Sequence, residues 1–367
     1  MRPLDVDTLR QWLDSGRRVT VVDIRSPEEF AESHVPGSIN VFAYDALKAG
    51  DAHALDGFSV AGGGPVVAVC GRGRIATIAS EVLRARGVDA LTLAGGMHAW
   101  SAAWNTADVP LASGTAEIVQ VRRSAKGCLS YVVAEGGAAA IIDPSLGPHV
   151  YVNLCRERGW TISHVLDTHI HADHLSRAKT LAELTGAILM LPRTDRVRFA
   201  HRALDDGARL RLGSAEIVAL RTPGHTPEST TYLVDNAAAI TGDTLFLASV
   251  GRPDLHGDGQ QVTAAAHDLY RSLRKVAEFG SDTLILPGHV AGVVAFDHLP
   301  LVARLADVRS SNPLFDASES DFVGAITGRI LPTPPNYHRI VELNEAGAPL
   351  PADPLELEAG ANRCAAT

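Results

Sequence analysis

The sequence predicts two α/β domains in a chain of 367 residues. Three observations carry this prediction. At about 150 residues per domain, the length allows two domains. Short β-branched runs alternate with stretches of helical spacing in both halves of the chain, a pattern typical of α/β folds. Small residues and turn formers gather between the halves, so residues 107–114 are the predicted linker.

The first domain, residues 1–106, reads as strand, loop, helix and strand. The runs VTVVDI, ending at Ile24, and PVVAV, ending at Val69, have the continuous apolar character of strands buried in a parallel sheet. A stretch of helical spacing then extends to Gly87, where glycine fits the left-handed residue that ends many helices. The run ALTL is the next predicted strand.

The second domain, residues 115–309, opens with the β runs AEIVQV, SYVV and AAAIID. Further β runs then alternate with helical patterns such as VTAAAHDLYRSLRKV, which again predicts an α/β fold. The tail, residues 310–367, contains several prolines. We therefore expect it to be mostly extended and packed on the second domain.

Charge and cysteine content limit the classes of partner. Lys and Arg number 33 and Asp and Glu number 42, so the net charge of −9 argues against a nucleic acid or a membrane surface as the partner. The four cysteines form no CxxC pair, and the sequence shows neither a secretory signal nor a long apolar run. We therefore expect a cytoplasmic protein that acts on small molecules, with Cys128 and Cys155 as small buried core residues.

Seven side chains of metal-ligand type follow predicted strands. Four of them lie in the segment THIHADH, directly after the apolar run HVL, and each of the other three follows its own β run and is preceded by glycine. The seven are His169, His171, Asp173, His174, His225, Asp243 and His289. Because neighbouring strands end at the same sheet edge, these side chains are predicted to line one metal site.

The motifs HxHxDH, GHT, GDT and PGH occur in the order and spacing of the metallo-β-lactamase superfamily, which residues 116–307 resemble. The resemblance implies an αββα sandwich with the metal at one edge. Within the superfamily, THIHADH, TGDTLFLASVGRPDL and RSSNP are more similar to persulfide dioxygenases than to thioesterases. That similarity implies one Fe(II) per chain, held by His169, His225 and Asp243 with positions left open.

The remaining four residues of the group would then surround the iron without binding it. They are His171, Asp173, His174 and His289. A hydrolase with two zinc ions per chain would instead use all seven residues. The ligand set alone leaves both arrangements open.

The resemblance also implies the small-molecule partners. Persulfide dioxygenases oxidise the terminal sulfur of a thiol persulfide with O2 to sulfite and release the thiol. Arg252, in GRPDL, matches the family arginine that holds the glutathione part of the substrate, and an ion pair with Asp254 is the alternative. Tyr337 either reaches the same pocket or packs within the tail. Val250 stands where the family carries a cysteine, which leaves the thiol unidentified.

The N-terminal domain is similar to a rhodanese domain through the segments VVDIRSPEEFAESHVPGSINV, VAVCGRGRIA and LAGGMHAW. The resemblance implies sulfur transfer from thiosulfate or a persulfide, with Cys70 as the nucleophile. Cys70 precedes a predicted helix N-terminus, where backbone N–H groups favour a thiolate, and Arg72 and Arg74 add positive charge. Ile75 stands where active loops have an arginine, so a loop that only binds a persulfide is an alternative.

Together these patterns predict a persulfide dioxygenase coupled to rhodanese-type sulfur transfer. The first alternative is a zinc-dependent thioester hydrolase resembling glyoxalase II, with an accessory rhodanese domain. The second is a module that binds or senses sulfane sulfur. The sequence leaves open which thiol carries the persulfide, the direction of sulfur transfer and whether the chain forms a homo-oligomer.

Overall fold

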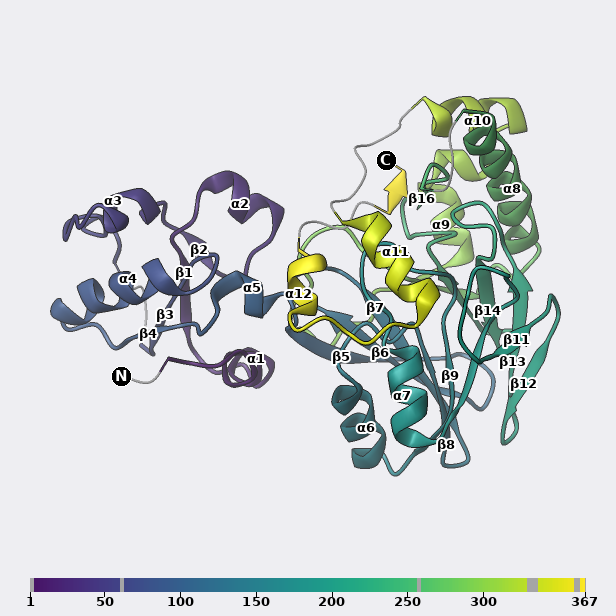
Figure 1. Ribbon diagram of the computed structural model, residues 1–367, viewed down its shortest axis with the longest axis horizontal. Helices are drawn as coiled ribbons and strands as arrows, with labels where there is room; N and C mark the ends of the chain where they lie inside the picture. The colour runs from purple at the N-terminus through teal and green to yellow at the C-terminus, as the bar shows by residue number, and fades with distance from the viewer. Residues whose placement is uncertain (1–2, 60–62, 256–258, 329–335, 360–363, 367) are drawn as a thin grey trace.

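The computed structural model describes residues 3–59, 63–255, 259–328, 336–359 and 364–366. It contains a smaller and a larger α/β domain, which lie side by side (Figure 1). The two-domain α/β class predicted from the sequence is therefore confirmed.

The N-terminal domain is built on a parallel sheet with the strand order β2-β1-β3-β4. The strands are β1 (Thr20–Asp23), β2 (Ile39–Asn40), β3 (Val66–Val69) and β4 (Ala90–Thr92). The helices are α1 (Val6–Asp14), α2 (Pro27–Glu32), α3 (Tyr44–Lys48), α4 (Arg74–Ala85) and α5 (Gly96–Trp100). Val22 and Ala68 enter the apolar cluster on one face of the sheet, and Val21 and Val67 enter the cluster on the other. Because both faces are covered, β1 and β3 read as continuous apolar runs.

The second domain is a sandwich of two sheets. One sheet has the order β11-β10-β9-β8-β7-β6-β5, and the other has the order β12-β13-β14-β15-β17-β18. The first is made of β5 (Trp104–Val109), β6 (Glu117–Arg123), β7 (Leu129–Glu135), β8 (Ala138–Ile142), β9 (Thr161–Leu166), β10 (Ile188–Pro192) and β11 (Arg202–Leu204). The second is made of β12 (Arg209–Leu212), β13 (Ala215–Arg221), β14 (Thr230–Val234), β15 (Ala238–Gly242), β17 (Leu284–Pro287) and β18 (Ala303–Arg304). Tyr131, Ile142, Tyr232 and Ile240 lie fully buried between the sheets.

Helices cover both outer faces of this sandwich. Helices α6 (Pro148–Glu157) and α7 (Ala178–Thr185) pack on the first sheet. The second sheet is covered by α8 (Gly259–Ala277), α9 (Leu305–Ser311) and α10 (Glu319–Thr327). The layers are therefore helix, sheet, sheet and helix, as predicted. Among the described helices, none combines the length and the apolar character needed to cross a membrane.

Two expectations about the connecting segments were wrong. The interval 107–114 is not all linker, because β5 includes its first three residues and pairs with β6 along its whole length, which satisfies the backbone groups. The tail is not mostly extended either. It contains α10, α11 (Tyr337–Ala346) and α12 (Pro354–Leu357), and Phe322 and Ile326 of α10 pack into the same apolar cluster as α8. The prolines at 332, 334 and 335 lie outside the described residues.

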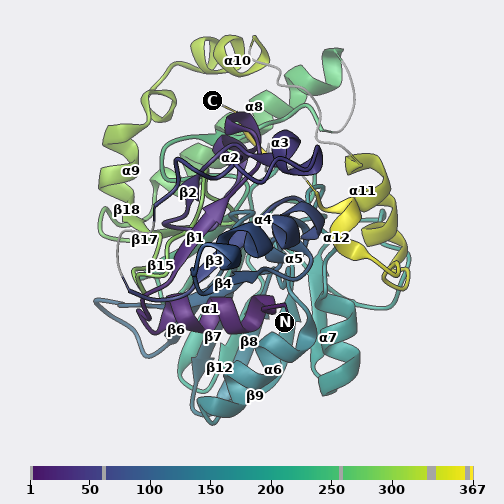
Figure 2. The same ribbon diagram turned by 90° about the vertical axis from the view of Figure 1, so that its left-hand side faces the viewer.

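The tail contacts both domains. Helix α12 lies beside α5 of the N-terminal domain in both ribbon views (Figures 1 and 2). Asp353, just before α12, lies 2.9 Å from Nε2 of His98, and Glu356 pairs with Arg72. The Ser33 hydroxyl also donates directly to the Ala125 carbonyl, over 3.1 Å. The tail is therefore part of the contact between the domains.

Candidate metal centre

The seven residues predicted to line a metal site follow four strand ends of the sandwich. Residues 169–174 follow β9 of the first sheet, whereas His225, Asp243 and His289 follow β13, β15 and β17 of the second. Strands β15 and β17 are parallel, and β13 runs in the same direction because β14 is antiparallel to both β13 and β15. The ligand loops therefore emerge at one edge of the sandwich.

Glycines let these loops approach one another. A methyl group on Gly288 would lie 2.6 Å from Oδ1 of Asp243, and one on Gly242 would lie 2.5 Å from the Thr168 hydroxyl oxygen. Both distances are far below van der Waals contact, so a side chain at either position would push the loops apart. Gly242 and Gly288 are thus required by the close approach of the loops, whereas Gly224, before His225, is required by its approach to Leu269 of α8.

Three buried polar atoms face one another without a hydrogen-bond partner. They are Nε2 of His169, Nε2 of His225 and Oδ2 of Asp243. The two nitrogens lie 3.9 Å and 3.6 Å from Oδ2. Unsatisfied buried polar atoms are costly, and three of them around one point indicate a missing partner. A metal ion bound by all three would satisfy them.

The hydrogen bonds on the far side of each imidazole set its tautomer. His225 Nδ1 donates to the Arg252 carbonyl over 2.9 Å. His169 Nδ1 lies 2.8 Å from the Thr168 hydroxyl, which itself donates to Asp143 and so accepts from the histidine. With the proton held on Nδ1, each ring directs the lone pair of Nε2 towards Asp243. This is the arrangement that metal-binding histidines require.

Burial and neighbouring charges hold these groups in the protonation states of metal ligands. Burial lowers the pKa of His225, and burial together with His171 lowers the pKa of His169 well below the ordinary range. Burial alone would raise the pKa of Asp243, but His289 lowers it. Two neutral imidazoles and one carboxylate therefore face the same point, and together they offer only lone pairs.

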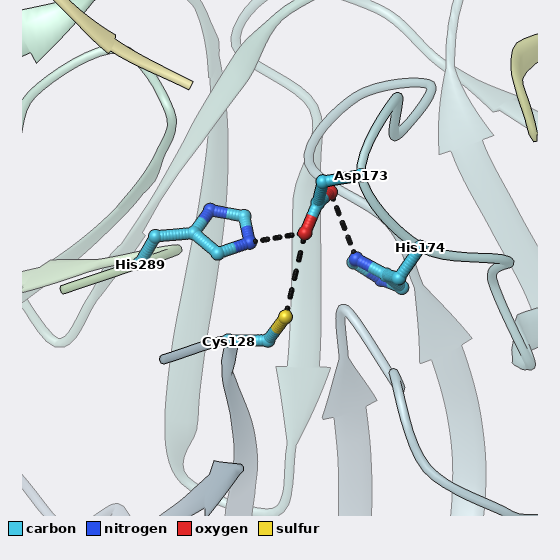
Figure 3. A group of neighbouring side chains, drawn as sticks. All are labelled: Cys128, Asp173, His174 and His289. Atoms are coloured by element: carbon cyan, nitrogen blue, oxygen red, sulfur yellow. Dashed lines mark hydrogen bonds and ion pairs between the residues drawn. The ribbon is translucent and has the colours of Figure 1, made fainter. Parts of the chain in front are cut away.

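A second cluster surrounds the carboxylate of Asp173 (Figure 3). It accepts from His174 Nδ1 over 3.0 Å, from His289 Nε2 over 2.8 Å and from the Cys128 thiol over 3.4 Å. His289 Nδ1 also donates to Oδ1 of Asp243 over 2.6 Å. Burial alone would lower the pKa of His289, but Asp243 and Asp173 raise it well above the ordinary value. Both ring nitrogens of His289 are therefore in hydrogen bonds to carboxylates.

His171 points to a different partner from the other histidines. Its Nε2 lies 3.2 Å from Oδ1 of Asp143 and 3.8 Å from Oδ1 of Asp167, and all three residues are buried. Burial raises the pKa of Asp167 to about 6, against the opposing effect of His171. His171 thus supports the ligand loop through Asp143, the carboxylate that also holds Thr168.

The predicted substrate residues lie next to this centre. Arg252 is 2% exposed, and its guanidinium donates to both carboxylate oxygens of Asp254, over 2.7 and 2.6 Å. Tyr337 is half-buried at the start of α11, where burial and Asp254 raise its pKa. A cavity of about 370 Å³, lined by His169, Asp167 and apolar side chains of α7, β10 and α11, adjoins the metal position. Substrate binding by Arg252 and Tyr337 stays a prediction.

Two cysteines near the centre were not found from the sequence. Cys128 was expected to be a core residue, but it contacts Asp173. Burial and Asp173 would raise the pKa of the thiol, but His289 and His174 together lower it to about 7. Cys364 lies with Asp243 and His289 in a third group of potential ligands. Of the two cysteines expected in the core, Cys155 packs in an apolar cluster as expected.

The Cys70 loop lies between β3 and α4, as predicted. The sulfur accepts from the Ala76 N–H over 3.4 Å, at the N-terminal turn of α4. Cys70 is 2% exposed and packs with Ile75 in an apolar cluster. Arg72 is exposed and pairs with Glu356 of the tail, while Arg74 is exposed at the start of α4.

The comparisons with known proteins agree with the two-domain organisation of the chain. Residues 5–103 match the family described as rhodanese-like domain, and residues 123–289 match the metallo-beta-lactamase superfamily. A hydroxyacylglutathione hydrolase of Rhodospirillum rubrum is 35% identical over 42% of this chain, which spans only 57% of that enzyme. Human mitochondrial persulfide dioxygenase ETHE1 is 30% identical, with 57% of this chain and 79% of the human protein covered.

A solved structure gives the same assignment. The crystal structure of ETHE1 from Myxococcus xanthus is 29% identical, with a TM-score of 0.54 and coverage of 62% of this chain and 97% of that chain. The chain therefore belongs to the metallo-β-lactamase superfamily and carries a rhodanese-like domain before it. Within that superfamily it is similar both to hydroxyacylglutathione hydrolases and to ETHE1 persulfide dioxygenases.

Proposed function

We propose that the chain is a mononuclear iron persulfide dioxygenase whose N-terminal domain performs rhodanese-type sulfur transfer. The observation that carries the proposal is that the two carboxylate oxygens of Asp243 have different surroundings. Its Oδ1 accepts a hydrogen bond from His289 Nδ1, while its Oδ2 faces His169 and His225 and has no hydrogen-bond partner. Two imidazoles and one carboxylate oxygen are the set typical of non-haem Fe(II) oxygenases. Bound there, Fe(II) would supply the positions at which a persulfide and O2 react.

Neighbouring residues of the chain orient the three proposed ligands. The hydrogen bond from His289 Nδ1 to Oδ1 fixes the rotation of the Asp243 carboxylate, so that Oδ2 faces the metal position. The Arg252 carbonyl fixes His225 in turn. The ligands are 2% exposed or less, which keeps bulk water away from the position. Partners that orient ligands in this way are worth about 10- to 100-fold in metal affinity or activity.

Cys70 is the proposed nucleophile for sulfur transfer. The N–H of Ala76 at the start of α4 stabilises negative charge on its sulfur, as expected for a thiolate or persulfide at a helix N-terminus. Thiosulfate and small persulfides are the proposed donors. Similarity to the Myxococcus xanthus and human ETHE1 proteins supports the oxygenase activity in the second domain.

Oxygen dependence tests the proposal. Purified full-length protein should consume O2 only when a small-molecule persulfide is added, and it should form sulfite in proportion. A thioester such as an acylated glutathione should not be cleaved under nitrogen. Thioester turnover under nitrogen, without persulfide-dependent O2 uptake, would contradict the proposal.

A two-zinc thioester hydrolase is the second candidate function, and one observation favours it. Ligand atoms of Cys128, Asp173, His174 and His289 lie within 4.8 Å of one another, close enough to hold a second metal if His289 lost its protons. The similarity to hydroxyacylglutathione hydrolases supports the same activity. The hydrogen bonds that occupy both nitrogens of His289 favour the oxygenase.

A further inference from the structure

The strand β19 (Ala365–Ala366) brings Cys364 to the metal centre. It pairs in the antiparallel direction with β16 (Val250–Gly251), as Figure 1 shows at the C-terminal end of the chain. Gly251 packs directly on the ligand loops, because a methyl group there would lie 1.9 Å from the Asp243 carbonyl oxygen and 3.0 Å from His225 Cβ. The strand that follows Cys364 is therefore one strand away from two metal ligands.

The sulfur of Cys364 lies among polar groups and not in an apolar core. Cys364 is 1% exposed, and its sulfur lies within 4.8 Å of ligand atoms of Asp243 and His289. Oδ2 of Asp243, in the same carboxylate, is buried and lacks a hydrogen-bond partner. The group of His169, His225 and Asp243 does not include the sulfur. The thiol therefore stands beside the metal position and not in it.

The backbone of Cys364 lies beside Arg252, the residue predicted to hold the glutathione part of the substrate. The Arg252 guanidinium is engaged by Asp254, and the Arg252 N–H donates to the Cys364 carbonyl over 3.0 Å. A substrate carboxylate would have to displace a buried ion pair, which is costly. Building on the proposed dioxygenase function, we propose that Cys364 is the thiol that carries sulfane sulfur at the metal centre. The substrate class is then a persulfide on the protein itself.

Sulfane sulfur can be transferred to Cys364 by thiol–persulfide exchange alone. The Cys364 sulfur attacks the terminal sulfur of a donor persulfide, a new S–S bond forms as the donor's S–S bond breaks, and the thiol proton passes to the departing thiolate. The sulfane sulfur keeps its oxidation state, so the step needs no oxidant or reductant. The added atom extends the side chain by one S–S bond, about 2.05 Å.

The tail that precedes Cys364 contacts both sulfur sites. Glu356 pairs with Arg72 of the Cys70 loop. Glu358 pairs with Arg123 and Arg177 and accepts from the Leu175 N–H, directly after the THIHADH segment. The donor persulfide is therefore either a small molecule or the persulfide of Cys70, which share the same chemistry.

Mass spectrometry of the intact protein's cysteines tests the assignment without requiring turnover. Full-length protein is loaded with cysteine persulfide in the absence of oxygen, alkylated and digested. We expect the Cys364 peptide to carry one additional sulfur atom, and the peptide of Cys155, a cysteine buried in an apolar cluster, to carry none. Loading from thiosulfate that disappears in Cys70→Ser would assign Cys70 as the donor, and loading that persists would assign the small molecule.

Kinetics of the variants complete the test. Cys364→Ser and Cys364→Ala should lower kcat for sulfite formation by roughly a hundredfold or more at unchanged metal content and melting temperature, while Cys155→Ser keeps the wild-type rate. Full activity in Cys364→Ser, with no extra sulfur on Cys364 in the wild type, would overturn the carrier role and leave the dioxygenase standing. Sulfur uptake by Cys364 without any persulfide-dependent O2 uptake would refute the dioxygenase and support the carrier role.

Discussion

The metal centre and the Cys70 loop differ in how far their polar groups are satisfied. At the metal centre, the facing atoms of His169, His225 and Asp243 are buried without a hydrogen-bond partner. In the loop, the Cys70 sulfur accepts from a backbone N–H and packs among apolar residues. A cation site without its ion contains buried lone pairs that have no hydrogen-bond partner. The sulfur of a nucleophilic cysteine can instead be fully hydrogen-bonded and packed before its substrate binds. The structure is therefore more informative about the metal than about the sulfur donor.

Removing a metal ligand should have the largest effect. His225→Ala deletes one of three ligands, so we expect loss of bound metal and loss of persulfide-dependent O2 uptake to background. Metal content per chain and an oxygen electrode measure both. His267→Ala removes an exposed histidine that pairs with Glu319 on the surface and should change neither. Retention of metal by His225→Ala would show that the three facing atoms are not the ligand set.

Replacing Cys70 should abolish sulfur transfer in the N-terminal domain and leave O2 uptake at the metal centre unchanged. Cys70→Ser should abolish sulfur transfer from thiosulfate to cyanide, because a hydroxyl is a far weaker nucleophile than a thiolate. O2 uptake with an added small persulfide should stay at the wild-type rate. Transfer that survives in the variant would remove Cys70 from its assigned role. A wild-type protein without any transfer would favour a binding or sensing role for the domain.

Glu358, at the end of α12, pairs with Arg123 and Arg177, and its effect on stability should depend on pH. Burial alone would raise the pKa of Glu358, but Arg123 and Arg177 lower it from 4.5 to about 2. Because its pKa is lower in the folded state, the carboxylate stabilises the fold above pH 4.5, and this contribution fades as the pH falls towards 2. Glu358→Gln should therefore cost roughly 3 kcal/mol at neutral pH.

Urea unfolding of both proteins at pH 7 and pH 3 measures this dependence. The difference between wild type and Glu358→Gln should shrink at the lower pH. Glu356→Gln is the matched control, since its ion pair with Arg72 is more than half exposed and contributes less than about 1 kcal/mol. An equal difference at both pH values would mean that the charge of Glu358 does not stabilise the fold.

His174→Ala should have the smallest effect on the metal. If His174 only holds Asp173, its removal should keep most of the iron and lower activity by about 10- to 100-fold. In a two-zinc enzyme the same change would remove the second metal and nearly all activity. Metal content and rate, measured beside His225→Ala, distinguish these outcomes.

The positions of the seven side chains at strand ends could be predicted from the sequence because each follows a strand within a short motif. The β runs before His225, Asp243 and His289 are local signals, and Gly242 and Gly288 mark the close approach of the loops. The same local logic placed Cys70 between β3 and α4.

Residues placed by distant pairing could not be predicted in this way. Cys128 reaches the cluster through a bridge to His289, and Cys364 reaches it because β19 pairs with β16. Neither contact leaves a pattern in the surrounding sequence. The prediction of an extended tail was wrong because prolines mark where helices end. They do not show whether helices form between those positions. Pro354, for example, lies in the first turn of α12.

Metal content, determined together with oxygen demand, tests the central claim most directly. Protein purified without oxygen from iron-supplemented cells should hold close to one iron ion per chain, and O2 uptake should require a persulfide and yield sulfite. Two zinc ions per chain, with thioester cleavage under nitrogen and no persulfide-dependent O2 uptake, would contradict the proposed mononuclear oxygenase with His169, His225 and Asp243 as its ligands.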